Sequence, residues 1–200
     1  MLTQPTVEQL TSLGLMEMAH KWQQQQQDPE AAQLSFDERF AQLVDAQYLC
    51  NFNKRIARLL SEAKLRLGQA CVEDVDFPKS RELDRPLWRQ LATGRYLDDK
   101  KGVLIVGATG TGKTYLACAL GQQACRQGRR VRYARTNRLL EELAVARADG
   151  SYPKALGRLA RLELLILDDF LMVPPSESQR RDLFEVLEDR SGNRSTLCTS

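Results

Sequence analysis

The chain has 200 residues, of which 42% are hydrophobic and 28% charged, so it can bury a core and is not a disordered polymer. No run approaches the ~18 consecutive apolar residues of a membrane span, and the N-terminus lacks the basic region of a signal peptide. Five cysteines without a Cys-x-x-Cys pair, together with one histidine, exclude the usual zinc patterns and predict reduced thiols in a cytoplasmic protein.

Residues 1–75 are predicted to form a small all-α domain. Apolar residues recur at helical spacing within residues 6–22, and a helix should stop at Asp28 and Pro29. Ser35 to Glu38 has the form of a capping box, and a helical period of apolar residues follows as far as Gly68. Because one such helix would be about 48 Å long, we expect a break near residues 50–53.

Residues 76–200 are predicted to form an α/β domain, joined through an acidic, linker-like segment at residues 73–86. Beyond Lys101, short apolar runs of strand type alternate with helical segments. The runs are residues 102–106, 131–134, 164–167 and 196–199, and the helical segments are residues 114–126, 137–147 and 179–190. This alternation is typical of a parallel sheet with helices on both faces.

The first of these strands is followed by a phosphate-binding motif, Gly-x-x-x-x-Gly-Lys-Thr. Its glycines let the loop bend so that backbone N–H groups point at phosphate oxygens, beside the positive end of the next helix. Lys113 is expected to reach the β- and γ-phosphates of ATP, and the Thr114 hydroxyl is expected to bind Mg²⁺. The predicted nucleotide-binding residues are Gly107, Ala108, Thr109, Gly110, Thr111, Gly112, Lys113, Thr114 and Tyr115.

A second motif is the apolar strand that ends in Asp168 and Asp169. Asp168 is predicted to be the second Mg²⁺ ligand, and Asp169 to orient or deprotonate the attacking water, so that Lys113 and Asp169 are the predicted catalytic residues. The strand at residues 195–200 should lie between the other two strands that carry motifs. Thr199 and Ser200 are candidate sensors of the γ-phosphate, the alternative being that they simply end a strand.

Basic residues gather in two stretches. Residues 52–69 hold five basic residues and one acid, and residues 126–138 hold six arginines and no acid, so these stretches carry +10 in a chain of net charge +3. Such segregation predicts a surface that meets a polyanion, although either stretch alone is equally consistent with a solvated face. The predicted contacts with the phosphates of DNA or another polyanion are Lys54, Arg55 and Arg58, so the domain of residues 1–75 is predicted to bind DNA or a partner. The arginines of residues 126–138 are the second choice.

Several of these runs resemble IstB, the family of ATP-dependent transposition helpers of bacterial insertion sequences. They are Gly107–Leu120, the Leu164–Phe170 segment ending in Asp-Asp-Phe, Leu187–Arg190, Leu34–Arg39 and Cys71–Asp76. The resemblance covers nearly the whole chain and implies a P-loop ATPase of the AAA+ type. It also implies ATP-driven homo-oligomers on double-stranded DNA and stimulation of a partner transposase.

Two alternatives stay open. A helicase loader of the DnaC type would share the fold but prefer single-stranded DNA. Only Phe52 and Tyr133 place aromatic rings within the basic stretches, which favours the duplex. The other alternative is an interaction protein that binds nucleotide with little hydrolysis.

The family pattern continues past Ser200 with a fifth strand and an arginine finger, so we expect a C-terminally truncated chain. Without a fifth strand, residues 103–106 would form an unpaired apolar edge that favours aggregation. An arginine finger is worth roughly 10³–10⁵ in rate, and ATP hydrolysis to ADP and phosphate by this chain alone is therefore expected to be weak.

Overall fold

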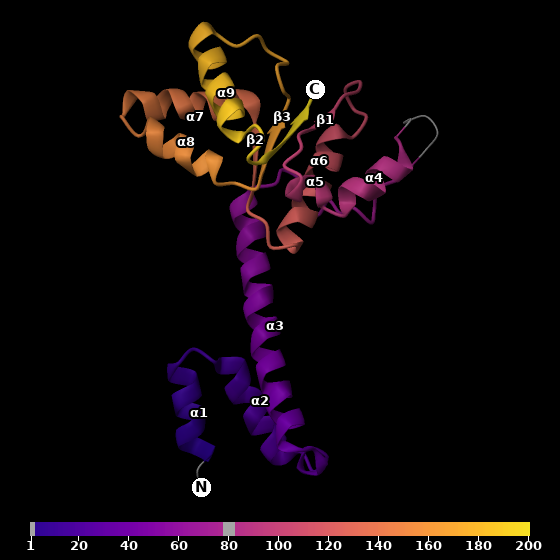
Figure 1. The fold of residues 1–200 in the computed structure, drawn as a ribbon, viewed down its shortest axis with the longest axis vertical. Helices are drawn as coiled ribbons and strands as arrows, with labels where there is room; N and C mark the ends of the chain where they lie inside the picture. The colour runs from indigo at the N-terminus through magenta and orange to yellow at the C-terminus, as the bar shows by residue number, and fades with distance from the viewer. Residues whose placement is uncertain (1–2, 78–82) are drawn as a thin grey trace. The chain divides into compact units, whose positions relative to one another are not determined.

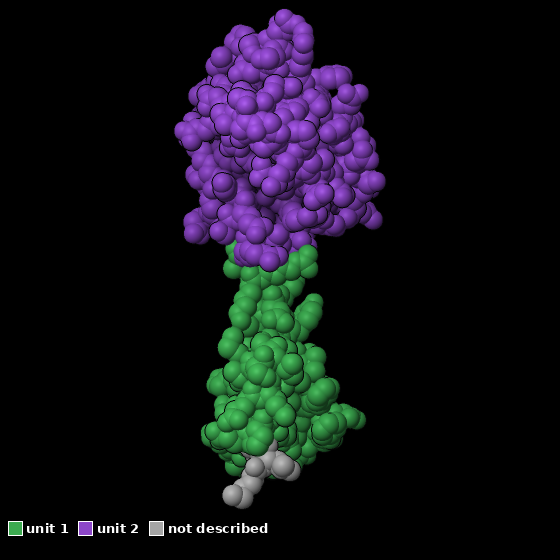
Figure 2. Space-filling model, turned by 90° about the vertical axis from the view of Figure 1, so that its left-hand side faces the viewer, with its two compact units in different colours: residues 1–57 green, residues 58–200 purple. Residues whose placement is uncertain are grey.

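The computed structural model describes residues 3–77 and 83–200 (Figure 1). The chain divides into two compact units, residues 1–57 and residues 58–200, which are coloured separately in Figure 2. Among the described residues, none of the helices combines the length and the apolar composition that a bilayer crossing requires.

The first unit is helical. It contains α1 (Thr3–Ser12), α2 (Met16–Gln27), the short 3₁₀ helix η1 (Ala31–Gln33) and most of α3 (Phe36–Ala63). The stripe predicted over residues 6–22 is divided between two helices, because Gly14 adopts a positive φ of 76° and ends the first of them. The side-chain oxygen of Gln47 accepts hydrogen bonds from the backbone N–H groups of Glu17 and Met18, which satisfies the first turn of α2.

Helix α3 is continuous from Phe36 to Ala63, so the predicted break near residues 50–53 is wrong. The helix contains neither glycine nor proline, the residues that most often cause a sharp bend. The predicted capping box is present, since Ser35 Oγ accepts from the Glu38 N–H at 3.3 Å and Glu38 Oε2 accepts from the Ser35 N–H at 2.8 Å.

The two units divide after residue 57, whereas the composition of the sequence predicts a boundary near residue 75. Leu59 and Ala63, at the end of α3, are buried in a hydrophobic cluster of the second unit, and so are Ala70 and Val75. Apolar residues before the acidic segment and within it therefore already belong to the core of the second unit.

The second unit is an α/β fold. Its helices are the end of α3, α4 (Arg85–Ala92), α5 (Arg95–Asp98), α6 (Lys113–Arg126), α7 (Thr136–Ala148), α8 (Tyr152–Ala160) and α9 (Glu177–Arg190). Its strands are β1 (Val103–Ile105), β2 (Val131–Arg135), β3 (Leu164–Asp168) and β4 (Ser195–Thr199). The strands pair in parallel in the order β1-β4-β3-β2, which confirms the predicted place of the last strand between β1 and β3.

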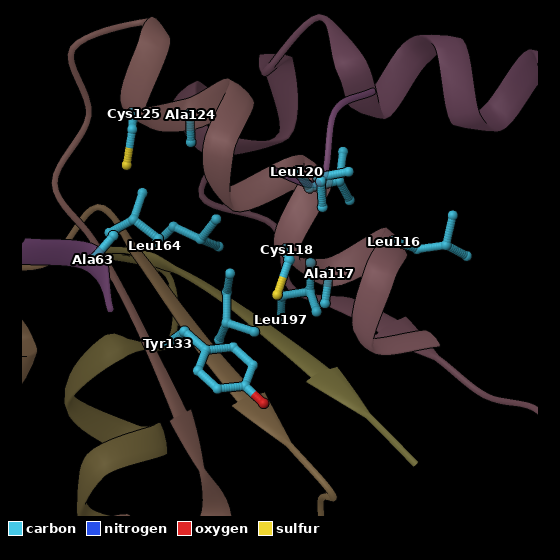
Figure 3. Close-up of a cluster of buried hydrophobic side chains, with 14 of the residues drawn as sticks. Ala63, Leu116, Ala117, Cys118, Leu120, Ala124, Cys125, Tyr133, Leu164 and Leu197 are labelled. Carbon is cyan, nitrogen blue, oxygen red and sulfur yellow. The ribbon is translucent and has the colours of Figure 1, made fainter. Parts of the chain in front are cut away.

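Helices cover both faces of this sheet (Figure 1). Leu164 and Ile166 of β3 pack in the cluster that contains α6, whereas Leu165 and Leu167 pack in the cluster of α7, α8 and α9. All five residues of β3 are buried, as expected for a central parallel strand covered on both sides. Figure 3 shows Cys118 of α6 directed toward the strands in the first of these clusters, near Leu197 of β4.

Strand β1 lies at the edge of the described sheet. Leu104 and Val106 are 64% and 70% exposed, and a cavity of about 710 Å³ runs along this strand and α4. The predicted apolar edge is therefore present.

Candidate functional site

The phosphate loop connects β1 to α6, and glycines shape it. Gly110 and Gly112 adopt positive φ angles of 84° and 87°, which cost a glycine little. Thr111 Oγ1 donates to the Ala108 carbonyl at 2.8 Å. Lys113 Nζ donates to the carbonyls of Gly107 and Ala108 at 2.6 and 2.9 Å, so the loop encloses the amino group of its own lysine.

Asp168 ends β3 and is only 1% exposed. Its carboxylate accepts hydrogen bonds from Thr114 Oγ1 at 3.0 and 3.2 Å, from Tyr133 Oη at 2.5 Å, and from Thr199 Oγ1. Burial by itself would raise the pKa of Asp168, but the hydrogen bonds from Thr199, Tyr133 and Thr114 hold it below its usual value. The carboxylate is therefore ionised and fixed in place by hydroxyl donors.

Asp169 has a different environment from its neighbour. It adopts a positive φ of 54°, and its backbone N–H donates to Thr199 Oγ1 at 3.3 Å. Its side chain is 43% exposed, with Oδ2 at 3.5 Å from Arg135 Nε. The bend at Asp169 thus turns the second carboxylate toward solvent while the first stays buried.

The end of β4 joins the loop to Asp168. Ser200 pairs through its backbone, since its N–H donates to Ile105 O at 3.0 Å and its carbonyl accepts from the Gly107 N–H at 3.2 Å. A cavity of about 410 Å³, which we call the nucleotide cavity, opens between these elements. Its lining includes Thr109, Gly110, Gly112, Lys113, Thr114, Tyr115, Asp168, Asp169, Thr199 and Ser200.

Tyr115 lines this cavity with its ring packed against the hydrophobic core, and its hydroxyl accepts from the Cys71 N–H at 3.5 Å. The oxygens of Thr114 and Asp168, about 3 Å apart, are of the hard type that Mg²⁺ prefers. The loop backbone and Lys113 suit the phosphates of a nucleotide. The residues present therefore fit both ATP and Mg²⁺.

The residues at this site that were not predicted to bind nucleotide include Arg66, Leu67 and Met172, which line the cavity. They also include Tyr133 and Arg135, which contact Asp168 and Asp169. Tyr133 and Arg135 lie on β2, and Arg135 is in register with Asp168 on β3. Arg66 follows α3, with Nη1 at 4.0 Å from Asp168 Oδ2. The sequence held one signal for the residues at the end of β2, because neighbouring parallel strands present their carboxyl ends at the same edge of the sheet. No local sequence pattern pointed to Arg66.

The arginines of residues 126–138 are mostly paired with acids from other parts of the chain. Their ion pairs are Arg126 with Glu73, Arg129 with Asp98 and Glu163, Arg132 with Glu142, and Arg135 with Asp169. The segregation of charge along the sequence is thus largely undone in space. Lys54, Arg55 and Arg58 lie on the exposed surface of α3, where Arg58 pairs with Glu62 at 3.7 Å.

Comparisons with known proteins agree with this geometry. The profile of the family described as IstB-like ATP binding protein matches residues 8–200. Over all 200 residues, the chain is 46% identical to a Pseudomonas fluorescens protein described as the ATP-binding protein of insertion sequence IS1162, and it covers 87% of that relative.

The solved structures that are similar to this chain include two proteins of DNA replication. The match to the crystal structure of the DnaC helicase loader has a TM-score of 0.57 at 23% identity. It covers 66% of this chain and 76% of the DnaC chain. The match to the replication initiator DnaA bound to AMPPCP and single-stranded DNA has a TM-score of 0.56 at 20% identity. It covers 66% of this chain and 42% of the DnaA chain. At these identities the likeness shows the fold alone.

Proposed function

This chain belongs to the family of IstB-like ATP-binding proteins, and we propose that it is an ATPase of the AAA+ type that assists DNA transposition. In this proposal ATP binding drives the chain into homo-oligomers on double-stranded target DNA, and the assembly stimulates a partner transposase. The relative from an insertion sequence supports this biological context.

The observation that carries the ATPase assignment is the meeting of four elements at one cavity. The phosphate loop, the first turn of α6, the end of β3 and the end of β4 all contribute to its lining. They come from parts of the chain up to about 90 residues apart, and a glycine-rich turn with no role in binding would not require this convergence.

Each residue has a role in this proposal. Lys113 exchanges its bonds to the loop carbonyls for bonds to phosphate oxygens, and Thr114 and Asp168 hold Mg²⁺. Bound Mg²⁺ would neutralise charge on the phosphates. Asp169, the exposed carboxylate, orients the attacking water and accepts its proton. Thr199 and Ser200 sense the γ-phosphate from the end of β4.

Contacts with DNA are proposed for Lys54, Arg55 and Arg58, whose positions on one helix suit the backbone of a duplex. Contacts of this kind hold phosphates and read little sequence. A helicase loader is the second candidate because of the likeness to the DnaC fold, and it would prefer single strands.

The test measures binding of labelled duplex and single-stranded DNA, with and without ATP and Mg²⁺, at two salt concentrations. Phosphate release and oligomeric state are followed on the same samples. Lys113→Ala removes the amino group of the loop. Lys154→Ala removes an exposed lysine on α8 that does not line the nucleotide cavity, and serves as the matched control.

We expect duplex binding and oligomers that depend on ATP, that are lost in Lys113→Ala and that persist in Lys154→Ala. A preference for single strands would support the loader instead. Nucleotide binding without phosphate release, even when a longer family member is mixed in, would identify an interaction protein and reject the enzyme.

A further inference from the structure

Arg66 brings a second cation to the nucleotide cavity. Among the described residues that line this cavity, Arg66 and Lys113 carry the positive charges, and Asp168 and Asp169 carry the negative ones. Lys113 belongs to the phosphate loop, whereas Arg66 comes from the segment that follows α3. The roles proposed for the loop and for the two acids leave Arg66 without one.

The segment after α3 is anchored on both sides of Arg66. Ala63 and Ala70 are both buried in the core of the second unit. Between them, Leu65 packs on α6 at Gly121, where a Cβ would lie only 2.9 Å from Leu65 Cδ2. The guanidinium of Arg66 is therefore carried on an anchored backbone, although the side chain itself is 48% exposed.

This anchoring places the charge of Arg66 beside the proposed Mg²⁺ ligands. Arg66 Nη1 is 4.0 Å from Asp168 Oδ2, and Thr114 Oγ1 is 3.0 Å from the same oxygen. A carboxylate that ligates Mg²⁺ has less negative charge to offer a guanidinium, and an ion pair with a half-exposed arginine is weak. Arg66 would then be free to bind another anion close by.

The terminal phosphate of ATP is the anion that suits this position. The backbone of a phosphate loop surrounds the α- and β-phosphates, while the metal spans the β- and γ-phosphates. A guanidinium next to the metal ligand Asp168 therefore lies near the γ-phosphate, and its planar fork matches two phosphate oxygens.

We propose that Arg66 binds the γ-phosphate of ATP, as a phosphate-binding residue supplied by the segment after α3. This inference rests on the proposed ATPase function. In that reaction the γ-phosphorus bonds to the water oxygen while its bond to the β–γ bridging oxygen breaks, ADP leaves, and Asp169 accepts the proton. Arg66 would neutralise charge on the γ-phosphoryl oxygens, a role that an arginine of the same chain can fill.

The test measures affinity by titration calorimetry for two nucleotides, the non-hydrolysable triphosphate AMPPCP and ADP. Arg66→Gln loses a charge-assisted contact to the third phosphate, so it is expected to weaken AMPPCP binding about tenfold and ADP binding by less than about twofold. Lys64→Gln is the matched control, because Lys64 is exposed on the same segment and does not line the nucleotide cavity. Its affinity for both nucleotides should stay within about twofold of the parent.

A second arm separates a contact with phosphate from an effect through Asp168. The titrations are repeated with EDTA in place of Mg²⁺, and the loss in Arg66→Gln is expected to persist, because the contact is made to the phosphate itself. A loss that disappears in EDTA would mean that Arg66 acts through Asp168 and the metal, and would overturn the proposal. Thermal unfolding of each variant shows that it is folded.

Two further outcomes would reject a γ-phosphate contact. They are an equal loss of affinity for AMPPCP and ADP in Arg66→Gln, and a loss no larger than that of Lys64→Gln. A failure of the proposed function would look different, because Lys113→Ala would then leave AMPPCP binding intact. Weak binding in Lys113→Ala beside unchanged binding in Arg66→Gln would reject the role of Arg66 alone.

Discussion

The phosphate loop is exposed from Gly107 to Thr111, whereas Asp168, which lines the nucleotide cavity together with part of this loop, is buried and receives hydrogen bonds from three hydroxyl groups. The side chains of Lys113 and Thr111 donate only to carbonyls of the loop itself, and one backbone bond, from the Gly107 N–H, joins the loop to Ser200. The Asp168 carboxylate accepts side-chain hydrogen bonds from three other elements, α6, β2 and β4.

This difference separates two kinds of contribution. Loop side chains that donate to carbonyls of the same loop can exchange those hydrogen bonds for bonds to a ligand. Substitutions of these side chains should therefore alter nucleotide binding with little effect on the fold. A buried carboxylate bonded to three elements helps to hold the fold, so changes there should alter stability as well. The predictions that follow test this division.

The largest effect is expected for Lys113→Ala. The variant loses the charge-assisted contacts of the ammonium group to phosphate, so ATP affinity should fall by about 100-fold, and hydrolysis with it. The free energy of unfolding without nucleotide should change by less than about 0.5 kcal/mol, because the lysine bonds only to exposed loop carbonyls. Titration calorimetry and urea unfolding measure the two quantities. Destabilisation beyond that seen for Lys154→Ala would contradict the division.

Asp168→Ala should lower the stability of the fold. It leaves the hydroxyls of Thr114, Tyr133 and Thr199 without their acceptor, and we expect a loss of about 2–3 kcal/mol in the free energy of unfolding. Urea unfolding in nucleotide-free buffer measures this loss. Asp189→Ala removes an exposed acid and should change stability by less than about 0.5 kcal/mol. Equal stability of the two variants would show that the hydroxyl cluster contributes nothing.

Gly110→Ala tests the effect of backbone conformation without the effect of a steric clash. Gly110 has a φ of 84°, and a Cβ there would meet no atom within 4 Å. Gly150 has a φ of 76° and equally open surroundings, between α7 and α8. Both substitutions should cost about 1 kcal/mol of stability through backbone strain, but only Gly110→Ala should weaken ATP binding, by about tenfold. Equal ATP affinities in calorimetry would mean that this position does not shape the phosphate site.

Tyr133→Phe is the mildest change. It removes one of the donors to Asp168 and leaves the ring in the core, so stability should fall by about 1 kcal/mol while ATP affinity stays within about threefold. Tyr48→Phe, at an exposed tyrosine of α3, should leave stability unchanged within about 0.5 kcal/mol. A loss of ATP affinity larger than the loss of stability would make Tyr133 part of the binding site itself.

Local patterns were sufficient to predict much of the fold. The capping box at Ser35, the four strands and the place of β4 in the sheet are present as predicted. Helix α8 was not predicted, and the stripe at residues 6–22 proved to be two helices. Helical spacing cannot show by itself where a helix ends, and at Gly14 the end depends on backbone conformation.

The sequence by itself determined the phosphate loop, the acids after β3 and the strand-helix alternation, because each depends on neighbouring residues and their spacing. Only the tertiary structure decided which hydroxyls hold Asp168, that Arg135 faces Asp169, and that most arginines of residues 126–138 have acidic partners. Those contacts join residues from different strands and helices. Pairing of this kind depends on the register and packing of the sheet, which no local spacing encodes.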